Sequence, residues 1–467
     1  MKFWKPAAPT AVALALAAAY PGVALAQSNS DLLNELKALK DRIGELEKKL
    51  ADKPAAAAPE KQWGMTPEQL QDFNRISVKT EATEDNLAAW GLKGLTISGF
   101  IEPVYIYNKL QHRAGFQFLN DQSSFNYDTS YMGSATIDFT KETDSGTKWK
   151  LTLTPNRGVG SLIGAGIVQE ASVSVPLTDL ATRLIAGQIP DWSGYEYQQP
   201  TLNPFTTHNL LYDFTLPAGY TGVGMDVKTG KWQFKGMIAN VNTSIRQAGE
   251  QSPVLAYRGD YSVGEYLGFG FAGLHGKAPN FNLGNSTVAH LLEADGYYTR
   301  GDWTFQGQFG VGMQKQGAIT TEPDGTLRDA QWWGLSALAG YTITPRLQGL
   351  VRADYIRNDK NGGGLFGYNS FTDAAGTAVS VDGRNGLGVD GNINCTVASG
   401  DPTLDGCSRG ANRYALSLGM KYSFNPSTTF KAEYRIDGAD RPVFVDIKDG
   451  TYHKTNQLFG ASVVVFF

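Results

Sequence analysis

The sequence has little cysteine and histidine and, beyond its first 26 residues, no long apolar run. No later stretch reaches the roughly 18 to 20 uncharged apolar residues that a membrane-spanning helix needs, so helical spans are excluded. The 41 basic residues are outnumbered by 45 acidic ones, and this balance gives no reason to expect a nucleic-acid partner. We also expect no cofactor and no metal site.

The residues that hydrolases use are sparse. No G-x-S-x-G nucleophile elbow is present. A serine or aspartate could still meet a histidine in the folded chain, so a barrel hydrolase remains an alternative, but we expect no enzyme. The five histidines are scattered along the chain: His112, His208, His275, His290 and His453.

The first 26 residues have the layout of a secretory signal peptide. Lys2 and Lys5 precede an apolar stretch from Ala11 to Ala19, and Ala24-Leu25-Ala26 provides an A-x-A cleavage site. Removing residues 1–26 takes away two lysines and no acid, which leaves 39 basic and 45 acidic residues and a net charge of −6. The chain is therefore predicted to leave the cytoplasm.

The two cysteines, Cys395 and Cys407, lie in one segment rich in glycine, asparagine and aspartate. In an exported chain, two cysteines this close in sequence predict a local disulfide. A metal site is the alternative, but no further cysteine or nearby histidine supports it.

Residues 27–52 are predicted to form a short periplasmic coiled coil. Apolar residues recur at spacings of four and three, with charged residues between them, which is a heptad pattern. About three heptads are marginal in isolation, so the segment would depend on an oligomer held together elsewhere. A single amphipathic helix is the alternative. The heptad positions are Leu32, Leu36, Leu39, Ile43, Leu46 and Leu50.

Residues 53–94 read as a linker of proline and alanine followed by a short helix. Prolines at 54 and 59 prevent the preceding helix from continuing. Thr66 and Pro67 then provide an N-cap and a proline at the first helical position. Residues 61–93 either stay in the periplasm or enter the following domain as a small plug.

From residue 95 to residue 467 the pattern changes to segments of about 8 to 14 residues that alternate with period two. Sixteen such strands are predicted, and the pattern is also compatible with 14 or 18. Their ranges are 95–108, 131–143, 147–156, 167–177, 181–189, 220–228, 231–241, 254–263, 266–275, 288–300, 302–315, 330–342, 346–357, 411–424, 427–438 and 454–467.

The connections between these strands alternate between very short turns and long segments rich in glycine, asparagine and proline. Thr229-Gly230 and Asn425-Pro426 are examples of the short turns, and 358–410 is the longest connection. Within 302–315, aromatic and aliphatic residues occupy one face and Thr304, Gln306 and Gln308 the other. Short turns facing long loops, with an apolar outside and a polar inside, are typical of outer-membrane barrels. The predicted fold is an all-β transmembrane antiparallel barrel preceded by a short helical coiled coil.

The final strand is apolar at every second position and ends in Phe467. This ending resembles the C-terminal insertion signal that the barrel-assembly machinery reads in bacterial outer-membrane proteins. An ordinary buried edge strand is the alternative. The signal interpretation predicts the barrel-assembly machinery and outer-membrane lipid as partners.

Several segments resemble the outer-membrane β-barrel porins, a superfamily that includes the phosphate-selective porins. The likeness rests on residues 97–105, on 168–173 leading into 186–190, and on the short stretches 194–196, 203–205 and 219–223. It covers residues 95–230 well and the remainder only by pattern. Members often carry a short coiled coil before the barrel. The resemblance implies a passive pore, and we expect a homotrimer.

Parity along the strands assigns a mixed set of charged residues to the barrel interior. The inward-facing set contains eleven basic and nine acidic candidates, so it predicts no preference for anions or cations. It contains no ladder of arginines or lysines that would support phosphate selectivity. The pore-lining candidates are Lys148, Lys150, Arg258, Arg352, Asp354, Arg413, Lys421, Lys431, Glu433 and Arg435.

Residues 190–219 form a long connection after the fifth strand, rich in Trp, Tyr, Gln, Pro and Asn. This connection either folds inward as a constriction or packs as an external loop. The inward interpretation makes Tyr195, Tyr197, Gln198, Gln199 and His208 candidates to contact a polar or sugar-like solute. The predicted function is passive diffusion of small hydrophilic solutes or ions, with a structural tether or adhesin barrel with a plugged lumen as the alternative.

Overall fold

The computed structural model describes residues 40–41, 67–119, 127–128, 132–155, 166–242, 248, 250–280, 283, 285–318, 322, 324–358, 371–372, 378–379, 385–392 and 409–467. The chain divides into two compact units, one made by Pro21–Leu95 and one containing Thr96–Phe467. The predicted signal peptide, the proline and alanine spacer, Cys395, Cys407 and all of the heptad positions lie outside the described residues.

The first unit contains the helix α2 (Pro67–Ala89). It begins at Pro67, as predicted, because the missing amide hydrogen of proline costs nothing in the first turn. The helix is longer than the short one expected and ends before Gly91, whose φ of +70° suits a glycine after a helix. In the part of the chain that the structure describes, no helix is long and apolar enough to cross a membrane.

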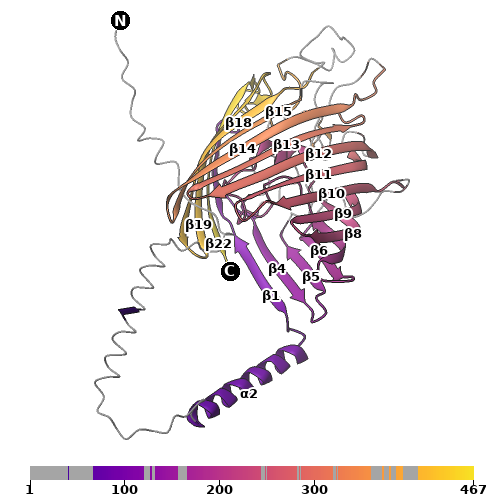
Figure 1. Cartoon of the computed structure of the whole chain (residues 1–467). Helices are drawn as coiled ribbons and strands as arrows, with labels where there is room; N and C mark the ends of the chain where they lie inside the picture. Colours follow the sequence, from indigo (N-terminus) through magenta and orange to yellow (C-terminus); the bar gives the residue numbers. More distant parts are fainter. Residues whose placement is uncertain are drawn as a thin grey trace. The chain divides into compact units, whose positions relative to one another are not determined.

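The second unit is a closed antiparallel β-barrel, and the predicted fold class is confirmed (Figure 1). Each of the sixteen predicted ranges overlaps a strand of its wall. The strands of the first half are β1 (Leu95–Ile101), β2 (Val104–Asn108), β4 (Ala135–Glu142), β5 (Lys148–Leu153), β6 (Val168–Pro176), β7 (Thr182–Pro190), β8 (Gly219–Thr229), β9 (Trp232–Val241) and β10 (Val254–Ser262). Those of the second half are β11 (Leu267–Asn280), β12 (Asn285–Arg300), β13 (Trp303–Gln314), β14 (Ala330–Thr344), β15 (Leu347–Arg357), β18 (Arg413–Asn425), β19 (Thr428–Ala439) and β22 (Thr455–Phe466).

The barrel closes where the last strand, β22, pairs with the first. Phe100 of β1 lies opposite Phe466, and Val104 of β2 lies opposite Ser462, so β1 and β2 keep one register and form one wall strand. The interruption between them falls at Pro103, which has no amide hydrogen to donate to the ladder. A short strand that was not predicted, β3 (Arg113–Gln117), pairs with β2.

Short connecting strands also occur outside the wall. They are β16 (Phe371–Thr372) with β17 (Ala378–Val379), and β20 (Phe444–Val445) with β21 (Tyr452–His453). Each pair forms its own two-stranded sheet within a connection that follows a wall strand.

Side chains alternate across the wall with large apolar residues outside. On β13, Phe309 is 43% exposed while its neighbour Gln308 is 4% exposed. Cross-strand registry carries the same alternation into β12 and β14, where Leu292 and Leu335 are exposed. A soluble protein would bury these residues, so the exterior has the inverted polarity that lipid imposes on a barrel.

Very short turns join the strands at one end of the barrel, called here the turn side. Gly230 and Gly301 have φ of +58° and +61°, which glycine adopts without strain in two-residue turns. Both Leu95 and Phe467, the ends of the barrel sequence, also lie at turn-side strand ends. The opposite end, the loop side, carries longer connections, among them residues 191–218.

Candidate functional site in the barrel lumen

The connection between β7 and β8, residues 191–218, folds into the barrel and is called here the inner segment. It contains the helix α3 (Leu210–Thr215), which contacts β13, β14 and β15. Asn209 caps this helix, because its side chain accepts a hydrogen bond from the backbone amide of Tyr212 at 2.8 Å. The inward alternative for residues 190–219 is therefore the one observed.

An apolar core holds α3 inside the loop-side half of the barrel. Leu210, Leu211 and Phe214 share one face of the helix and are fully buried. They belong to one cluster with inward-facing side chains from most of the wall, including Ile106, Met237, Leu274, Leu291, Trp332, Ile356 and Leu458. The loop-side half of the interior is thus packed as a protein core.

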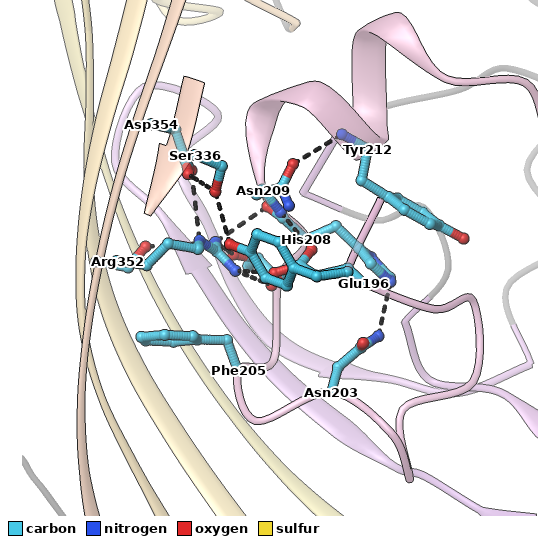
Figure 2. A network of polar contacts seen from close by, with 12 residues as sticks. Glu196, Asn203, Phe205, His208, Asn209, Tyr212, Ser336, Arg352 and Asp354 are labelled. Carbon is cyan, nitrogen blue, oxygen red and sulfur yellow. Dashed lines mark hydrogen bonds and ion pairs between the residues drawn. The ribbon is translucent and has the colours of Figure 1, made fainter. Parts of the chain in front are cut away.

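Arg352 of β15 joins the inner segment to the wall (Figure 2). Its Nη1 atom donates to Glu196 Oε1 at 2.9 Å and to the carbonyl of Thr207 at 2.8 Å, and Nη2 donates to the carbonyl of His208 at 3.0 Å. Phe205 covers the guanidinium, whose carbon lies 4.7 Å from the ring centre. A fully buried arginine with this set of partners fixes the segment more firmly than a surface ion pair would.

Other wall side chains satisfy the irregular backbone of the inner segment. Glu433 of β19 accepts from the amide and the hydroxyl of Thr207, both at 2.7 Å. Arg435 donates to the carbonyl of His208 at 2.7 Å, and Glu196 accepts from the amide of Asn209 at 2.6 Å. Buried backbone groups outside regular structure require such partners, so Glu433 and Arg435 of the wall, with Glu196 of the segment itself, make the inward fold tolerable.

Two arginines share one acid beside these contacts. Arg413 and Arg435 both donate to Asp437 Oδ1, at 2.7 and 2.9 Å. The guanidinium of Arg413 also lies about 5 Å from the ring centres of Tyr127, Phe214 and Phe444. Arg413 therefore packs at once on the wall, on α3 and on loop-side connections.

The buried cluster contains fewer guanidinium groups than carboxyl groups. Three arginines (Arg352, Arg413, Arg435) share the space with five acids, which are Glu196, Asp213, Asp354, Glu433 and Asp437. Both carboxyl oxygens of Asp213 lack a hydrogen-bond partner among the described residues, and burial raises its pKa well above the usual value. Burial raises the pKa of Glu196 to about 7, although Arg352 opposes the shift. These shifts reduce the charge imbalance of the cluster.

Among the described residues, Tyr197 lines two small cavities inside the barrel. Each has a volume of about 140 Å³. One is lined by Arg258, Asp260 and Asp295, and Arg258 binds the two acids at 2.7 Å each. The other is lined by Lys150, Glu170, Gln198 and Gln199 and also by Tyr212. Tyr197 is half-exposed between them, so this part of the lumen presents both charges and aromatic surface.

The structure places all five predicted constriction residues in the inner segment. Tyr197, Gln198 and Gln199 line the cavities. Tyr195 is buried with its hydroxyl 2.6 Å from that of Ser336, and His208 is buried and stacks on Tyr212. Tyr195 nevertheless lines the first cavity together with Tyr197, so among the five only His208 is absent from the lining of both cavities.

The ten predicted pore-lining residues all lie on the interior face but differ in exposure. Lys148 and Lys150 remain accessible, and Arg258 is mostly buried. The other seven are buried in the part of the wall that the inner segment covers: Arg352, Asp354, Arg413, Lys421, Lys431, Glu433 and Arg435. Lys431, for example, donates to the carbonyl of Pro200 at 2.5 Å.

Sequence reasoning missed four buried polar residues of the inner segment, namely Glu196, Thr207, Asn209 and Asp213. Three of them carry a signal in retrospect. Glu196 and Asp213 are two of the three acids in a connection that has no lysine or arginine, and Asn209 precedes the apolar pair Leu210 and Leu211 as a helix cap would.

These features define a class: a closed antiparallel barrel of sixteen wall strands whose third long connection folds inward and is bound by buried arginines of the wall. The chain belongs to the family described as "Protein of unknown function (DUF3138)", whose model matches residues 65–263 and 272–467. A comparison with curated proteins gave no match.

Several solved structures share the barrel. An anion-selective porin from Comamonas acidovorans is 10% identical, with 80% of this chain and 99% of that chain covered and a TM-score of 0.48. The OmpT outer membrane protein of Vibrio cholerae, in a trimer form, is 11% identical over 80% and 99% of the chains, with a TM-score of 0.47. The outer membrane channel DcaP of Acinetobacter baumannii is 12% identical over 80% and 97%, with a TM-score of 0.44. Likenesses this distant do not transfer a function, an oligomeric state or the role of a residue.

Proposed function

We propose that the chain is a bacterial outer-membrane channel through which small hydrophilic solutes or ions diffuse passively. The observation that carries this proposal is the combination of an apolar exterior with a charged, accessible interior on the turn side. A soluble barrel has no reason to expose Phe309 and Val311 while charged side chains point inward.

Aromatic side chains on the exterior support the membrane placement. Next to the short turns, Trp303 stacks on Phe305 at 5.4 Å and packs on Tyr341 at 4.8 Å, and Trp232 packs on Tyr261 at 4.7 Å. Toward the loop side, Trp333 packs on Tyr355 and on Phe309. The two levels are about eight residues apart on β13, or roughly 20 Å along the barrel axis once strand rise and tilt are applied. Girdles of this kind flank the hydrocarbon layer.

If the barrel is a channel, the inner segment narrows it. The part of the wall opposite its anchors carries Glu142, Lys148, Lys150 and Glu170 with accessible charges of both signs. Solutes would pass this part of the wall and the side chains of Tyr197, Gln198 and Gln199. Mixed charge there predicts weak discrimination between anions and cations.

The remaining assignments are proposals of the same kind. Phe467 is exposed, and its backbone exchanges two hydrogen bonds with Gly99, which leaves its ring free for the barrel-assembly machinery. We further infer a homotrimer in outer-membrane lipid with residues 27–94 in the periplasm. Native mass measurement of the full chain in detergent tests the trimer.

Conductance of the purified full chain in a planar bilayer tests the proposed function. We expect stepwise increases in current, with a reversal potential close to zero in a salt gradient. Tyr197→Ala should raise the single-channel conductance because it removes the ring between the two cavities. Tyr107→Ala, a tyrosine exposed on the exterior, is the matched control and should leave the conductance unchanged. A correctly folded barrel that passes no current contradicts the proposal.

One observation favours a second function, a structural tether with a plugged lumen. The apolar cluster around Leu211 and Phe214 draws side chains from most of the wall and fills much of the loop-side interior. If wild-type protein is silent and a variant that lacks residues 196–215 conducts, the inner segment is a plug and the tether function is favoured.

A further inference from the structure

A group of polar side chains interrupts the apolar exterior toward the loop side of β11 to β14. His275 of β11 and His290 of β12 lie opposite each other, and in the same row His290 faces Met313, which faces Gln331. They point outward, because they share strand parity with exposed residues such as Leu292 and Val288. Polar residues are costly on a surface that faces hydrocarbon, so this row requires an explanation.

The two histidines belong to a hydrogen-bonded chain. The Nδ1 atoms of His275 and His290 are 3.0 Å apart, and the hydroxyl of Tyr257 lies 3.0 Å from Nε2 of His275. Gly273 makes room for that tyrosine, since a Cβ there would lie 2.4 Å from the hydroxyl oxygen. The rings are thus held in place before any ligand arrives.

A cavity of about 560 Å³ lies over this row. Its polar lining is His275, His290, Gln331 and Arg357, and its apolar lining includes Leu292, Val311 and Trp333. The described residues that line it include an arginine and two histidines and no aspartate or glutamate. The described residues contain no group of three or more His, Cys, Asp or Glu side chains placed to hold a metal ion.

We propose that this cavity binds the phosphate-bearing headgroup of a lipid in the outer leaflet. Arg357 and the Nε2 atom of His290 would donate to the phosphate oxygens, while both ring nitrogens of His275 stay in the chain that orients His290. An acyl chain would run over the exposed side chains of Leu292 and Val311 toward the middle of the membrane. Trp333 lies opposite Arg357 on the neighbouring strand, where an aromatic ring suits the boundary between headgroup and hydrocarbon. This inference rests on the membrane placement given under the proposed function.

Native mass spectrometry of the full-length protein from detergent tests the site with two probes, lipid A carrying its phosphates and the same lipid A after removal of the phosphates. We expect the phosphorylated probe to be retained about tenfold better, which corresponds to the loss of one charge-assisted interaction. Arg357→Gln and the double variant His275→Gln with His290→Gln should each remove most of that preference.

Arg300→Gln is the matched control. Arg300 is exposed on the same strand as His290 but at the turn-side end, so its substitution should leave the preference intact. Equal retention of both probes by wild-type protein, or equal effects of Arg357→Gln and Arg300→Gln, would overturn the inference. Loss of oligomers in the cavity variants, without a change in lipid retention, would overturn it too and assign the surface to a second copy of the chain.

Bilayer conductance of the same variants separates this inference from the channel function. We expect Arg357→Gln to conduct as wild type does. Lipid preference without conductance would leave the lipid site in place and reject the channel, whereas conductance without lipid preference would reject the lipid site alone.

Discussion

Two sectors of the barrel wall carry inward-facing charged side chains, which are buried in one sector and exposed in the other. In the covered sector (β13, β14, β15, β18 and β19), Arg352 is completely buried and has hydrogen-bond partners on the inner segment. In the open sector (β4, β5 and β6), Lys148 is 49% exposed and pairs with Glu142 at 3.2 Å. The same strand parity therefore produces structural anchors in one sector and accessible charges in the other.

The difference arises from what faces each sector rather than from the strands themselves. The inner segment brings irregular backbone and an acid, Glu196, against the covered sector, and the several donors of one guanidinium group bind both at once. The open sector faces water, where lysine is adequate and contributes little to stability.

The largest expected effect comes from removing the anchor of the covered sector. Arg352→Met leaves Glu196, Asp354 and Glu433 buried without their shared partner and should lower the free energy of unfolding by about 3 to 5 kcal/mol. Urea titration in detergent measures this loss, and faster proteolysis within residues 191–218 should accompany it. A loss no larger than that of Lys148→Met, the matched substitution in the open sector, would erase the distinction between the sectors.

A second effect follows from the titration of Glu196, whose carboxyl faces Arg352, Asp354, Glu433 and the amide of Asn209. Burial raises its pKa to about 7, so the folded state holds the proton more tightly than the unfolded state does. The resulting stability is fully present below about pH 4.5 and is lost as the pH rises through about 7. We expect the free energy of unfolding to be about 2 to 3 kcal/mol higher at pH 5 than at pH 8.

Glu196→Gln provides the control for this pH dependence. It should reduce the difference between pH 5 and pH 8 by the part that Glu196 contributes, while Asp213, whose pKa burial also raises, keeps the remainder. Glu142→Gln in the open sector should leave the difference unchanged. Stability that rises from pH 5 to pH 8 in the wild type would contradict the assignment to Glu196.

A smaller effect concerns the helix cap of the inner segment. Asn209→Ala removes the acceptor for the amide of Tyr212 and should cost about 1 kcal/mol, while Asn209→Gly should cost only a few tenths. Thermal unfolding of the two variants compares these costs. Equal losses would mean that Asn209 acts through its contact with Gln308 instead of as a cap.

The smallest effect on stability is expected in the open sector. Lys148→Met should change the free energy of unfolding by less than about 1 kcal/mol, because its pair with Glu142 is exposed. It should nevertheless shift the reversal potential toward cation preference, since it removes an accessible positive charge from the lumen. An unchanged reversal potential would show that solutes do not pass the open sector.

The wall could be predicted from the sequence because its signals are local. Period-two alternation and short glycine turns placed β8 and β9 to within one residue, and the apolar ending placed β22. The structure differs from the prediction in two places in this region. Pro103 divides the first predicted strand into β1 and β2, and β3 forms within a connection for which no strand was predicted.

The inner segment could be predicted only as one of two alternatives. Its packing depends on pairs far apart in the chain, such as Glu196 with Arg352 and Thr207 with Glu433, which lie 156 and 226 residues apart. Parity identified Arg352 and Glu433 as inward-facing but could not tell which inward side chains would be covered. To tell covered from uncovered side chains, the path of residues 191–218 through the barrel must be known. The sequence of this connection has no periodic pattern from which that path could be predicted.

The anchoring of the inner segment also sets an order of assembly. Glu196 and Thr207 belong to a connection made after the strand β7, but the side chains that satisfy them come from β15 and β19. Until those late strands join the sheet, the segment has acids and backbone amides with no partners and stays in water. Capture of the segment therefore waits for β15 and β19, so a barrel intermediate that lacks these strands would carry residues 191–218 unprotected.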